Sequence, residues 1–288
     1  MDYDKLFEIV KKSSVDIKYK PADKALPAGV SKFGGKPHLP KDFVWPYYEG
    51  KGFGDVIKNR PLSFLAQINL QEVKQYDKDK LLPETGMLYF FYELETMEWG
   101  YNIKHKGSAR VYYYENIDNV QELDFPDDLD EDYIIPEFEM IFSSKDSIPD
   151  FQELEIQLES LYSEYPQLMA DFDEDGYIET CEEREYIQYD SSKLLGYADL
   201  IQGLITTECE LVTNGYDCGT GNYQLTDEQE RLIEENSKEW ILLCQMSGLE
   251  NDDYELMFGD CGSIYFYIKK SDLKNRSFEN IWMILQCC

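Results

Sequence analysis

The chain contains two similar segments, and this internal similarity constrains the fold more than any other sequence feature. Around Gln67 the sequence reads LSFLAQINL, and 19 residues later Gly86 lies in TGMLYFFYEL. Around Gln245 it reads WILLCQMSGL, and 17 residues later Gly262 lies in CGSIYFYIKK. Repeated patterns of this length indicate a repeated structural unit. We therefore expect the two segments to adopt the same local structure.

Each segment is also preceded by a related stretch, residues 32–39 in the first copy and 193–200 in the second. The common order predicts that residues 31–94 and 193–269 superpose as two copies of one unit. A strand that ends in glutamine, a connection and a glycine turn into an aromatic strand indicate two pairable strands per copy. The expected fold class is α+β, with two pseudo-twofold related repeats of mainly antiparallel strands and an acidic, partly helical insert.

The same reasoning divides the chain into three parts of one compact unit. Residues 1–115 are expected to hold an N-terminal helix, an extended arm and the first repeat. Residues 116–190 form the acidic insert, and residues 191–288 form the second repeat.

Local patterns predict further elements. Apolar spacing and end signals predict three helices, at residues 2–13, 151–165 and 226–239, the last opened by a capping box at Thr226. Aromatic and aliphatic runs predict strands within 112–114, 201–212 and 278–285. Prolines and glycines predict an extended arm from Pro21 to Pro46 and a loop at residues 50–54.

The net charge of −31 is concentrated in the middle of the chain. Between Glu115 and Glu185 there are 25 acidic residues, against only Lys145 and Arg184 as basic ones. This charge repels nucleic acids and anionic membranes, and it favours a basic protein or a cation as partner. A solvated surface that binds nothing is the alternative interpretation of such a run.

Cysteine spacing and hydropathy indicate the compartment. No run of 18 apolar residues occurs, and the first residues lack the pattern of a secretory signal. The seven cysteines form no CxxC pair. We therefore expect a cytoplasmic protein with reduced thiols.

One segment matches the twelve-residue loop of a calcium-binding EF-hand, from Asp171 to Glu182. In that loop, acidic residues at alternate positions converge on the ion, and Gly176 permits the sharp turn. The predicted metal ligands are Asp171, Asp173, Asp175, the Tyr177 carbonyl and Glu182. Calcium is thus the only cofactor predicted, and an acidic turn without a metal is the alternative.

Four other residues are candidates for a ligand cleft between the repeats, namely Gln67, Gln245, Asp260 and Trp45. The two glutamines occupy equivalent points of the repeats, where they can face one another across the pseudo-axis. Each candidate also has a structural interpretation: a buried amide that bonds backbone, a turn aspartate or an aromatic core residue.

No pair of nucleophile and base is evident. Cys218 lies in a glycine-rich loop, and the two histidines, His38 and His105, are far from it in sequence. We therefore predict no catalytic residue. The preferred hypothesis is an acidic protein-binding module, and the alternative is a small-ligand-binding or metal-dependent enzyme with its site in the cleft between the repeats.

Long ordered motifs give the chain a resemblance to a known family. The segments SKFGGKPHLP, PLSFLAQINL, WILLCQ and MFGDCGSIYFYI resemble the YwqG-like family of bacterial proteins of unknown function. The resemblance covers nearly the whole chain and is weakest from about Asn116 to Tyr189. It implies a cytoplasmic bacterial protein with an α+β fold, no established activity and, by analogy only, a role as an immunity or regulatory factor.

Overall fold

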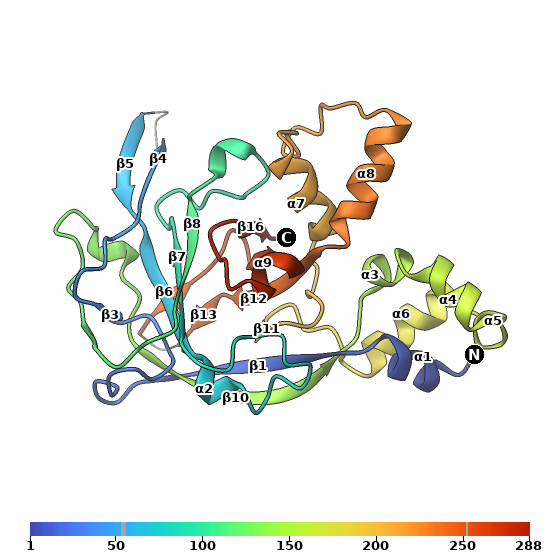
Figure 1. Cartoon of the computed structure of the whole chain (residues 1–288), viewed down its shortest axis with the longest axis horizontal. Helices are drawn as coiled ribbons and strands as arrows, with labels where there is room; N and C mark the ends of the chain where they lie inside the picture. Colours follow the sequence, from blue (N-terminus) through green and yellow to red (C-terminus); the bar gives the residue numbers. More distant parts are fainter. Residues whose placement is uncertain (53–55, 252) are drawn as a thin grey trace.

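The structure is a computed structural model that describes residues 1–52, 56–251 and 253–288. The predicted loop at residues 50–54 lies partly outside the described residues. A ten-stranded antiparallel sheet forms the centre of the molecule (Figure 1). In order across the sheet, the strands are β16 (Trp282–Gln286), β15 (Ser263–Lys269), β12 (Trp240–Ser247), β11 (Ser192–Leu194), β1 (Lys12–Pro21), β10 (Phe138–Ser147), β2 (Lys32–Phe33), β6 (Ser63–Asn69), β7 (Met87–Tyr92) and β8 (Ala109–Tyr114). The α+β class is as predicted.

Strand β1 lies in the middle of this sheet and was not predicted from the sequence. It pairs with β10 from Lys12 opposite Ser147 to Pro21 opposite Phe138, and with β11 on its other side. The helix expected at residues 2–13 therefore ends early, as α1 (Tyr3–Val10). Strand β10 belongs to the segment expected as an insert, so part of that segment builds the common sheet.

On either side of β1 and β10 lie four strands, β2–β6–β7–β8 in one half and β11–β12–β15–β16 in the other. The two halves share their register. Lys32 pairs with Gln67 in the first half, and Lys193 pairs with Gln245 in the second. The connections differ, because α2 (Leu70–Val73) follows β6, whereas the small hairpin of β13 (Leu249–Glu250) and β14 (Glu255–Leu256) follows β12.

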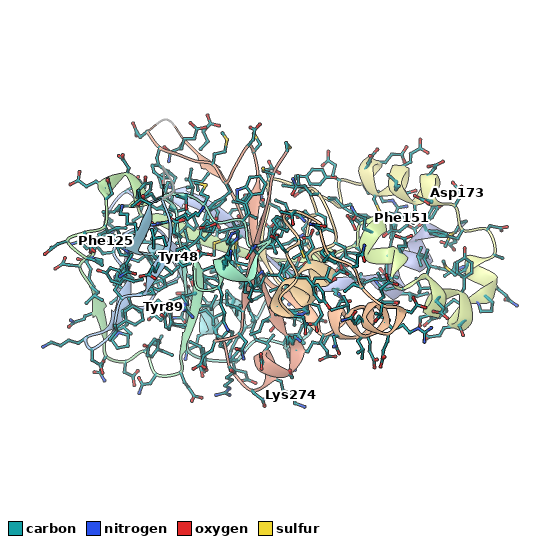
Figure 2. The ribbon with its side chains drawn as sticks, turned by 90° about the horizontal axis from the view of Figure 1, so that it is seen from above. Tyr48, Tyr89, Phe125, Phe151, Asp173 and Lys274 are labelled. Carbon is teal, nitrogen blue, oxygen red and sulfur yellow. The ribbon has the colours of Figure 1, made fainter. Side chains whose placement is uncertain are left out.

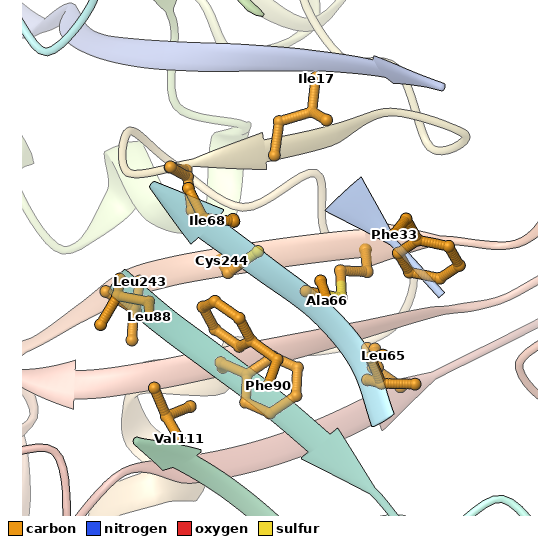
Figure 3. Close-up of a cluster of buried hydrophobic side chains, with 14 of the residues drawn as sticks. Ile17, Phe33, Leu65, Ala66, Ile68, Leu88, Phe90, Val111, Leu243 and Cys244 are labelled. Carbon is orange, nitrogen blue, oxygen red and sulfur yellow. The ribbon is translucent and has the colours of Figure 1, made fainter. Parts of the chain in front are cut away.

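The two halves pack face to face, so that the sheet folds over on itself around one large apolar core. Figure 3 shows Leu88 and Phe90 of β7 near Leu243 of β12 in this core. The rings of Phe90 and Phe266 meet across the two halves, with centroids 5.1 Å apart. Apolar side chains therefore fill the space between the halves, where the ligand cleft was expected.

The outer faces of the two halves are covered in different ways. The extended arm covers the first half and includes β3 (His38–Pro40), Phe43 and Trp45. Helix α7 (Ile205–Thr213) covers the second half. The prediction of a strand at residues 201–212 is therefore wrong: Ile205, Cys209 and Val212 are spaced for one helical face, and that face is buried.

A group of short helices lies at one end of the molecule, beyond the sheet (Figure 1). They are α1, α3 (Phe151–Glu155), α4 (Leu158–Glu164), α5 (Pro166–Met169) and α6 (Glu174–Glu183). These helices share a small core around Tyr177 and are called the helical lobe, meaning α1 and residues 151–189. Asp173 and Phe151 mark it at the end opposite Tyr48 and Phe125 (Figure 2). Among the described residues, no helix has the length and apolar character needed to cross a membrane.

Other elements test the remaining local predictions. Helix α8 (Asp227–Ser237) and its capping box at Thr226 are confirmed, as is a strand at residues 112–114, within β8. The strand expected at 278–285 begins only at Trp282, in β16. The remaining elements are η1 (Ile103–His105), η2 (Glu131–Tyr133), α9 (Lys270–Lys274), β9 (Val120–Glu122) paired with β3, and β4 (Tyr47–Lys51) paired with β5 (Ile57–Pro61).

The free side of the edge strand β16 is covered by the segment that links β7 to β8. The Leu285 amide donates to the Trp99 carbonyl over 3.0 Å, and the Trp282 indole donates to the Gly100 carbonyl over 2.8 Å. Gly100 has φ +84°, and a Cβ there would collide with the Met283 carbonyl. Glycine is therefore required where this segment crosses the edge of the sheet.

Candidate functional site

Gln67 is fully buried and bonds the arm to the sheet. Its Oε1 accepts from the His38 amide over 2.7 Å, and its Nε2 donates to the Val30 carbonyl over 2.7 Å. The same Nε2 lies 3.0 Å from Nδ1 of His38. Burial lowers the pKa of His38, and nearby Lys32 lowers it further, so this imidazole is neutral near pH 7.

Gln245 makes the corresponding contacts in the second half. Its Oε1 accepts from the Asp199 amide over 2.9 Å, and its Nε2 donates to the Ser191 carbonyl over 3.0 Å. Each glutamine thus bridges two backbone groups of its own half, and no hydrogen bond joins Gln67 to Gln245 within the described ranges. The expected meeting of the glutamines across a pseudo-axis is not what the structure shows.

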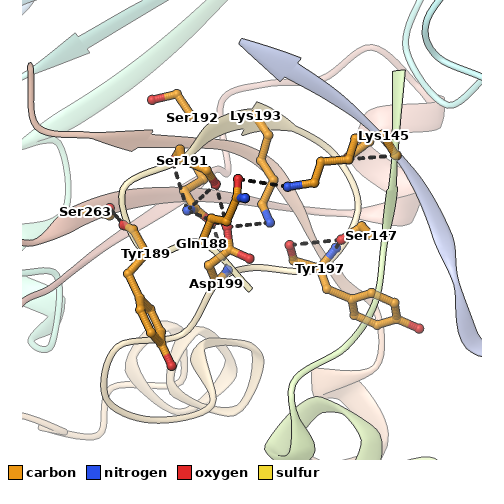
Figure 4. A network of polar contacts seen from close by, with 12 residues as sticks. Lys145, Ser147, Gln188, Tyr189, Ser191, Ser192, Lys193, Tyr197, Asp199 and Ser263 are labelled. Carbon is orange, nitrogen blue, oxygen red and sulfur yellow. Dashed lines mark hydrogen bonds and ion pairs between the residues drawn. The ribbon is translucent and has the colours of Figure 1, made fainter. Parts of the chain in front are cut away.

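A buried lysine stands opposite each glutamine. Lys32 is fully buried and pairs with Glu137 over 2.6 Å, while Lys193 pairs with Asp199 over 2.7 Å. Asp199 also accepts a hydrogen bond from Ser191 (Figure 4) and another from Gln245. Burial lowers the pKa of Lys193, and Asp199 acts against this shift. These two ion pairs were not predicted from the sequence, although the alignment of residues 32–39 with 193–200 already matched Lys32 with Lys193.

Two further carboxyl groups lie where the helical lobe meets the sheet. Asp150 caps α3 by accepting from the Glu153 amide over 2.8 Å, and burial raises the pKa of Asp150 to about 6. Glu153 is 6% exposed, and burial raises its pKa to about 7, with Lys12 favouring the charged form. No cation lies within ion-pair distance of Glu153 in the described part of the chain. No local sequence signal predicts this group, because its burial depends on how the helical lobe packs against the sheet.

The other two cleft candidates lie apart from the glutamines. Trp45 packs in the apolar cluster on the outer face of the first half. Its indole donates to the Leu62 carbonyl over 2.8 Å, and its ring meets Phe91 edge-on. Asp260 is exposed in the turn before β15, and its carbonyl accepts from the Cys288 amide over 3.1 Å. The four candidates therefore do not converge on one site.

Cys218 has a thiol unsuited to nucleophilic chemistry. Burial raises the pKa of Cys218 to about 11, and Glu208 and Asp217 add to the shift. A nucleophilic cysteine requires a neighbour that lowers its pKa, and here the charged neighbours are acidic.

The segment expected to be an EF-hand loop is mostly helical. Asp173 caps α6 by accepting from the Gly176 amide over 2.8 Å, and residues 174–183 continue as a helix. In a helix, side chains two positions apart point about 200° away from each other, so alternate carboxylates do not converge. Within the described ranges, no group of three or more His, Cys, Asp or Glu side chains is arranged to hold a metal.

Calcium binding by this segment stays a prediction, and the helix adds a condition to it, since α6 must unwind at its start. Calcium binding by Asp171–Glu182 should stabilise the folded protein by about 2.7 kcal/mol at a hundredfold excess over Kd, and it should therefore raise the melting temperature. It should also lower the helical circular dichroism signal. Glu182→Gln should remove both effects, and Glu183→Gln, one position outside the predicted ligands, should keep them. Melting curves that ignore millimolar calcium, or variants that respond alike, would contradict the prediction.

The surface of the helical lobe carries a dense negative charge. Residues 151–189 include twelve acidic side chains and one basic one, and all of the acidic ones except Glu153 are exposed. The one basic residue, Arg184, pairs with Asp4 over 2.6 Å. None of the eleven exposed carboxylates in residues 151–189 forms an ion pair with a cation of the described chain. Exposed apolar side chains lie among them, including Tyr162, Tyr165 and Ile178.

A family model, the domain of unknown function DUF1963, matches residues 31–287. This match covers most of the chain. The protein belongs to the DUF1963 family. A search of curated proteins found no match to the chain.

The DUF1963 match begins just before β2 and ends after β16, so it includes both halves of the sheet and the helical lobe except α1. It leaves out α1 and the central strand β1. The glutamines, the buried lysines and the acidic surface all lie inside it.

Proposed function

We propose that this DUF1963 protein is a binding module that holds a basic protein against its helical lobe. The main support for this proposal is the set of eleven exposed carboxylates that have no cationic partner within the described chain. Such a surface accelerates encounter with a cationic protein, because the summed field acts over about one Debye length. The same field supports the prediction that the protein binds neither nucleic acid nor anionic membrane.

The apolar side chains on the lobe support a specific complex rather than diffuse attraction. Tyr162 is 46% exposed and Tyr165 is 38% exposed, and both belong to or follow α4. Tyrosine supplies a large contact area at low entropic cost and is enriched at binding hot spots. Charge would then draw the partner in, and the tyrosines would supply contact once it has docked.

Three further proposals accompany this one. The shared registers and the parallel hydrogen bonds of Gln67 and Gln245 support an internal duplication. The motifs quoted above support placement in a YwqG-like group within DUF1963, with an immunity or regulatory role in the cytoplasm. The alternative of an enzyme with its site between the repeats has less support, because core side chains such as Phe90 and Phe266 occupy that space.

A photo-crosslinking experiment tests the binding proposal. The crosslinking amino acid p-benzoylphenylalanine is placed at Tyr162 on the lobe or, as a control, at Leu232, which is 51% exposed on α8. In living cells, the Tyr162 variant should form a discrete adduct with a protein of net positive charge, and the Leu232 variant should not. Adducts of equal yield at both positions, or none at Tyr162, would argue against the lobe as the binding surface.

Matched charge variants then measure the electrostatic part of that binding. Neutralising Glu159, Glu179, Glu182 and Glu183 to glutamine should weaken the complex with the crosslinked partner by about tenfold or more at low salt. The control neutralises Glu230, Glu234, Glu235 and Glu239 on or next to α8 and should change affinity by less than about twofold. Raising the salt from about 50 mM to about 300 mM should weaken the wild-type complex and leave the lobe variant nearly unaffected.

A further inference from the structure

A cavity of about 520 Å³ lies between the helical lobe and the second half of the sheet, and none of the exposed carboxylates of the lobe lines it. Its walls come from the start of β1, from α3, from the turn after β11 and from the start of β12. Cavities that hold small organic ligands commonly span about 300 to 1,000 Å³. The space is therefore large enough for a compact organic molecule.

Most of the wall is apolar. Its apolar side chains are Leu81, Ile156, Leu195, Trp240, Ile241 and Leu242. Trp240 is held in place by its indole, which donates to Glu210 over 2.9 Å. A fixed aromatic wall of this kind favours a ligand with an aromatic or aliphatic body.

One polar group on the wall has no partner. Thr206 is 7% exposed and lines the cavity, and its Oγ1 makes no hydrogen bond to any described residue. Buried hydroxyl groups are nearly always bonded, and this one, which has almost no accessible surface of its own, can take a partner from the cavity when the side chain turns. A threonine hydroxyl can donate to a carbonyl or carboxylate oxygen.

The cations at the cavity stand out in a chain of net charge −31. Lys12, Lys238 and Lys270 all line it. The Lys12 ammonium lies 3.6 Å from the centroid of the Tyr197 ring and has no ion-pair partner within the described ranges. Lys270 is fixed by donating to the Lys238 carbonyl over 2.7 Å. Lys238 pairs with Glu234 over 3.8 Å, so an anionic group in the cavity would give a partner to Lys12 in particular.

Two acidic residues share the lining. Burial lowers the pKa of Lys12, and Glu153 and Asp79 act against this shift without forming an ion pair with Lys12 among the described residues. Asp79 is exposed and accepts from the Ser13 amide over 3.0 Å. Burial raises the pKa of Glu153 to about 7, so this carboxyl is partly protonated at neutral pH. Lys12 and Lys193 favour its charged form, and Asp150 opposes it. A protonated Glu153 donates a hydrogen bond, as Thr206 does.

We propose that this cavity binds a small carboxylic acid, whose carboxylate meets Lys12 and the Thr206 hydroxyl and whose aromatic or aliphatic body lies along Trp240. This site is independent of the partner proposed for the helical lobe. Ammonium and hydroxyl groups together complement a carboxylate, and the apolar wall complements the rest of the molecule.

Isothermal titration calorimetry with three probes of one shape tests the proposal. The probes are 3-phenylpropanoate, 3-phenylpropanamide and 3-phenylpropylammonium, which share a body and differ in the charge of the head group. The carboxylate should bind at least about tenfold more tightly than the amide, and the ammonium probe should bind most weakly. Absence of carboxylate binding at millimolar concentration, or an order that favours the ammonium probe, would overturn the proposal.

Variants locate the site. Lys12→Met should weaken carboxylate binding by about tenfold and leave amide binding unchanged, whereas Lys18→Met, at an exposed position of the same strand outside the cavity lining, should alter neither. Thr206→Val should weaken carboxylate binding while preserving the fold, because it removes only the unpartnered hydroxyl. Equal effects of the two lysine variants would overturn the assignment of the carboxylate site to this cavity.

Discussion

Replacing Gln245 by leucine should lower the free energy of unfolding by about 2 to 5 kcal/mol, because the variant leaves buried backbone groups unpaired. The lost partners are the Asp199 amide and the Ser191 carbonyl, both bonded by one fully buried side chain. Leucine has nearly the same size, so the loss reports hydrogen bonding rather than packing. Urea denaturation with an unchanged m-value measures it.

Gln67→Leu should cause a loss of similar size, since its contacts to His38 and Val30 correspond to those of Gln245. Gln167→Leu, at an exposed position on α5, is the control and should change stability by less than about 0.5 kcal/mol. If only one of the two buried glutamines proves important, the two bridges are not energetic equivalents. If neither does, the hydrogen-bond argument fails.

Glu153→Gln should stabilise the protein at pH 8 by about 2 to 3 kcal/mol and have little effect below pH 5. Burial raises the pKa of Glu153 from its ordinary 4.5 to about 7, so the folded state binds a proton more readily than the unfolded state. Stability due to this group is therefore fully present below pH 4.5 and is lost as the pH rises through 7. Glutamine keeps the shape of the neutral acid and cannot ionise.

Denaturation curves of wild type and variant across this pH range give the difference directly, and other titrating groups cancel. Glu155→Gln removes an exposed carboxylate from the same helix and should produce no such pH-dependent difference. A Glu153→Gln difference that stays constant from pH 5 to pH 8 would show that the folded protein does not hold this carboxyl in a protonated state.

The elements predicted well are those whose signals are local. The capping box at Thr226 needs only residues 226 to 229, and the aromatic run at residues 87–92 can form little but a strand. The shared order of motifs also placed Gln67 and Gln245 at equivalent registers, because each glutamine strand pairs with the stretch that precedes it in its own half of the sheet.

The errors concern elements whose neighbours lie far away in the sequence. Strand β1 alternates Val15 and Ile17 with polar residues, a pattern that gains meaning only once β10 and β11 flank it. The EF-hand match rests on local spacing of carboxylates and on Gly176, whereas packing of Tyr177 and Cys181 against α1 favours a helix there, and calcium binding itself stays a prediction. The cavity was not predictable, since Lys12, Glu153 and Thr206 come to line one space only after the helical lobe has packed against the sheet.

The place of β1 also bears on the order in which the chain can fold. Each half contains pairings between neighbouring strands, such as β6 with β7 and β12 with β15. In contrast, Lys12 of β1 faces Ser147 of β10, and such distant contacts form slowly. During synthesis β1 emerges before the other strands of this sheet, yet both of its partners are made much later. Of the strands in this sheet, the one synthesised first is thus among the last to be paired, and its pairing joins two halves that can already have formed.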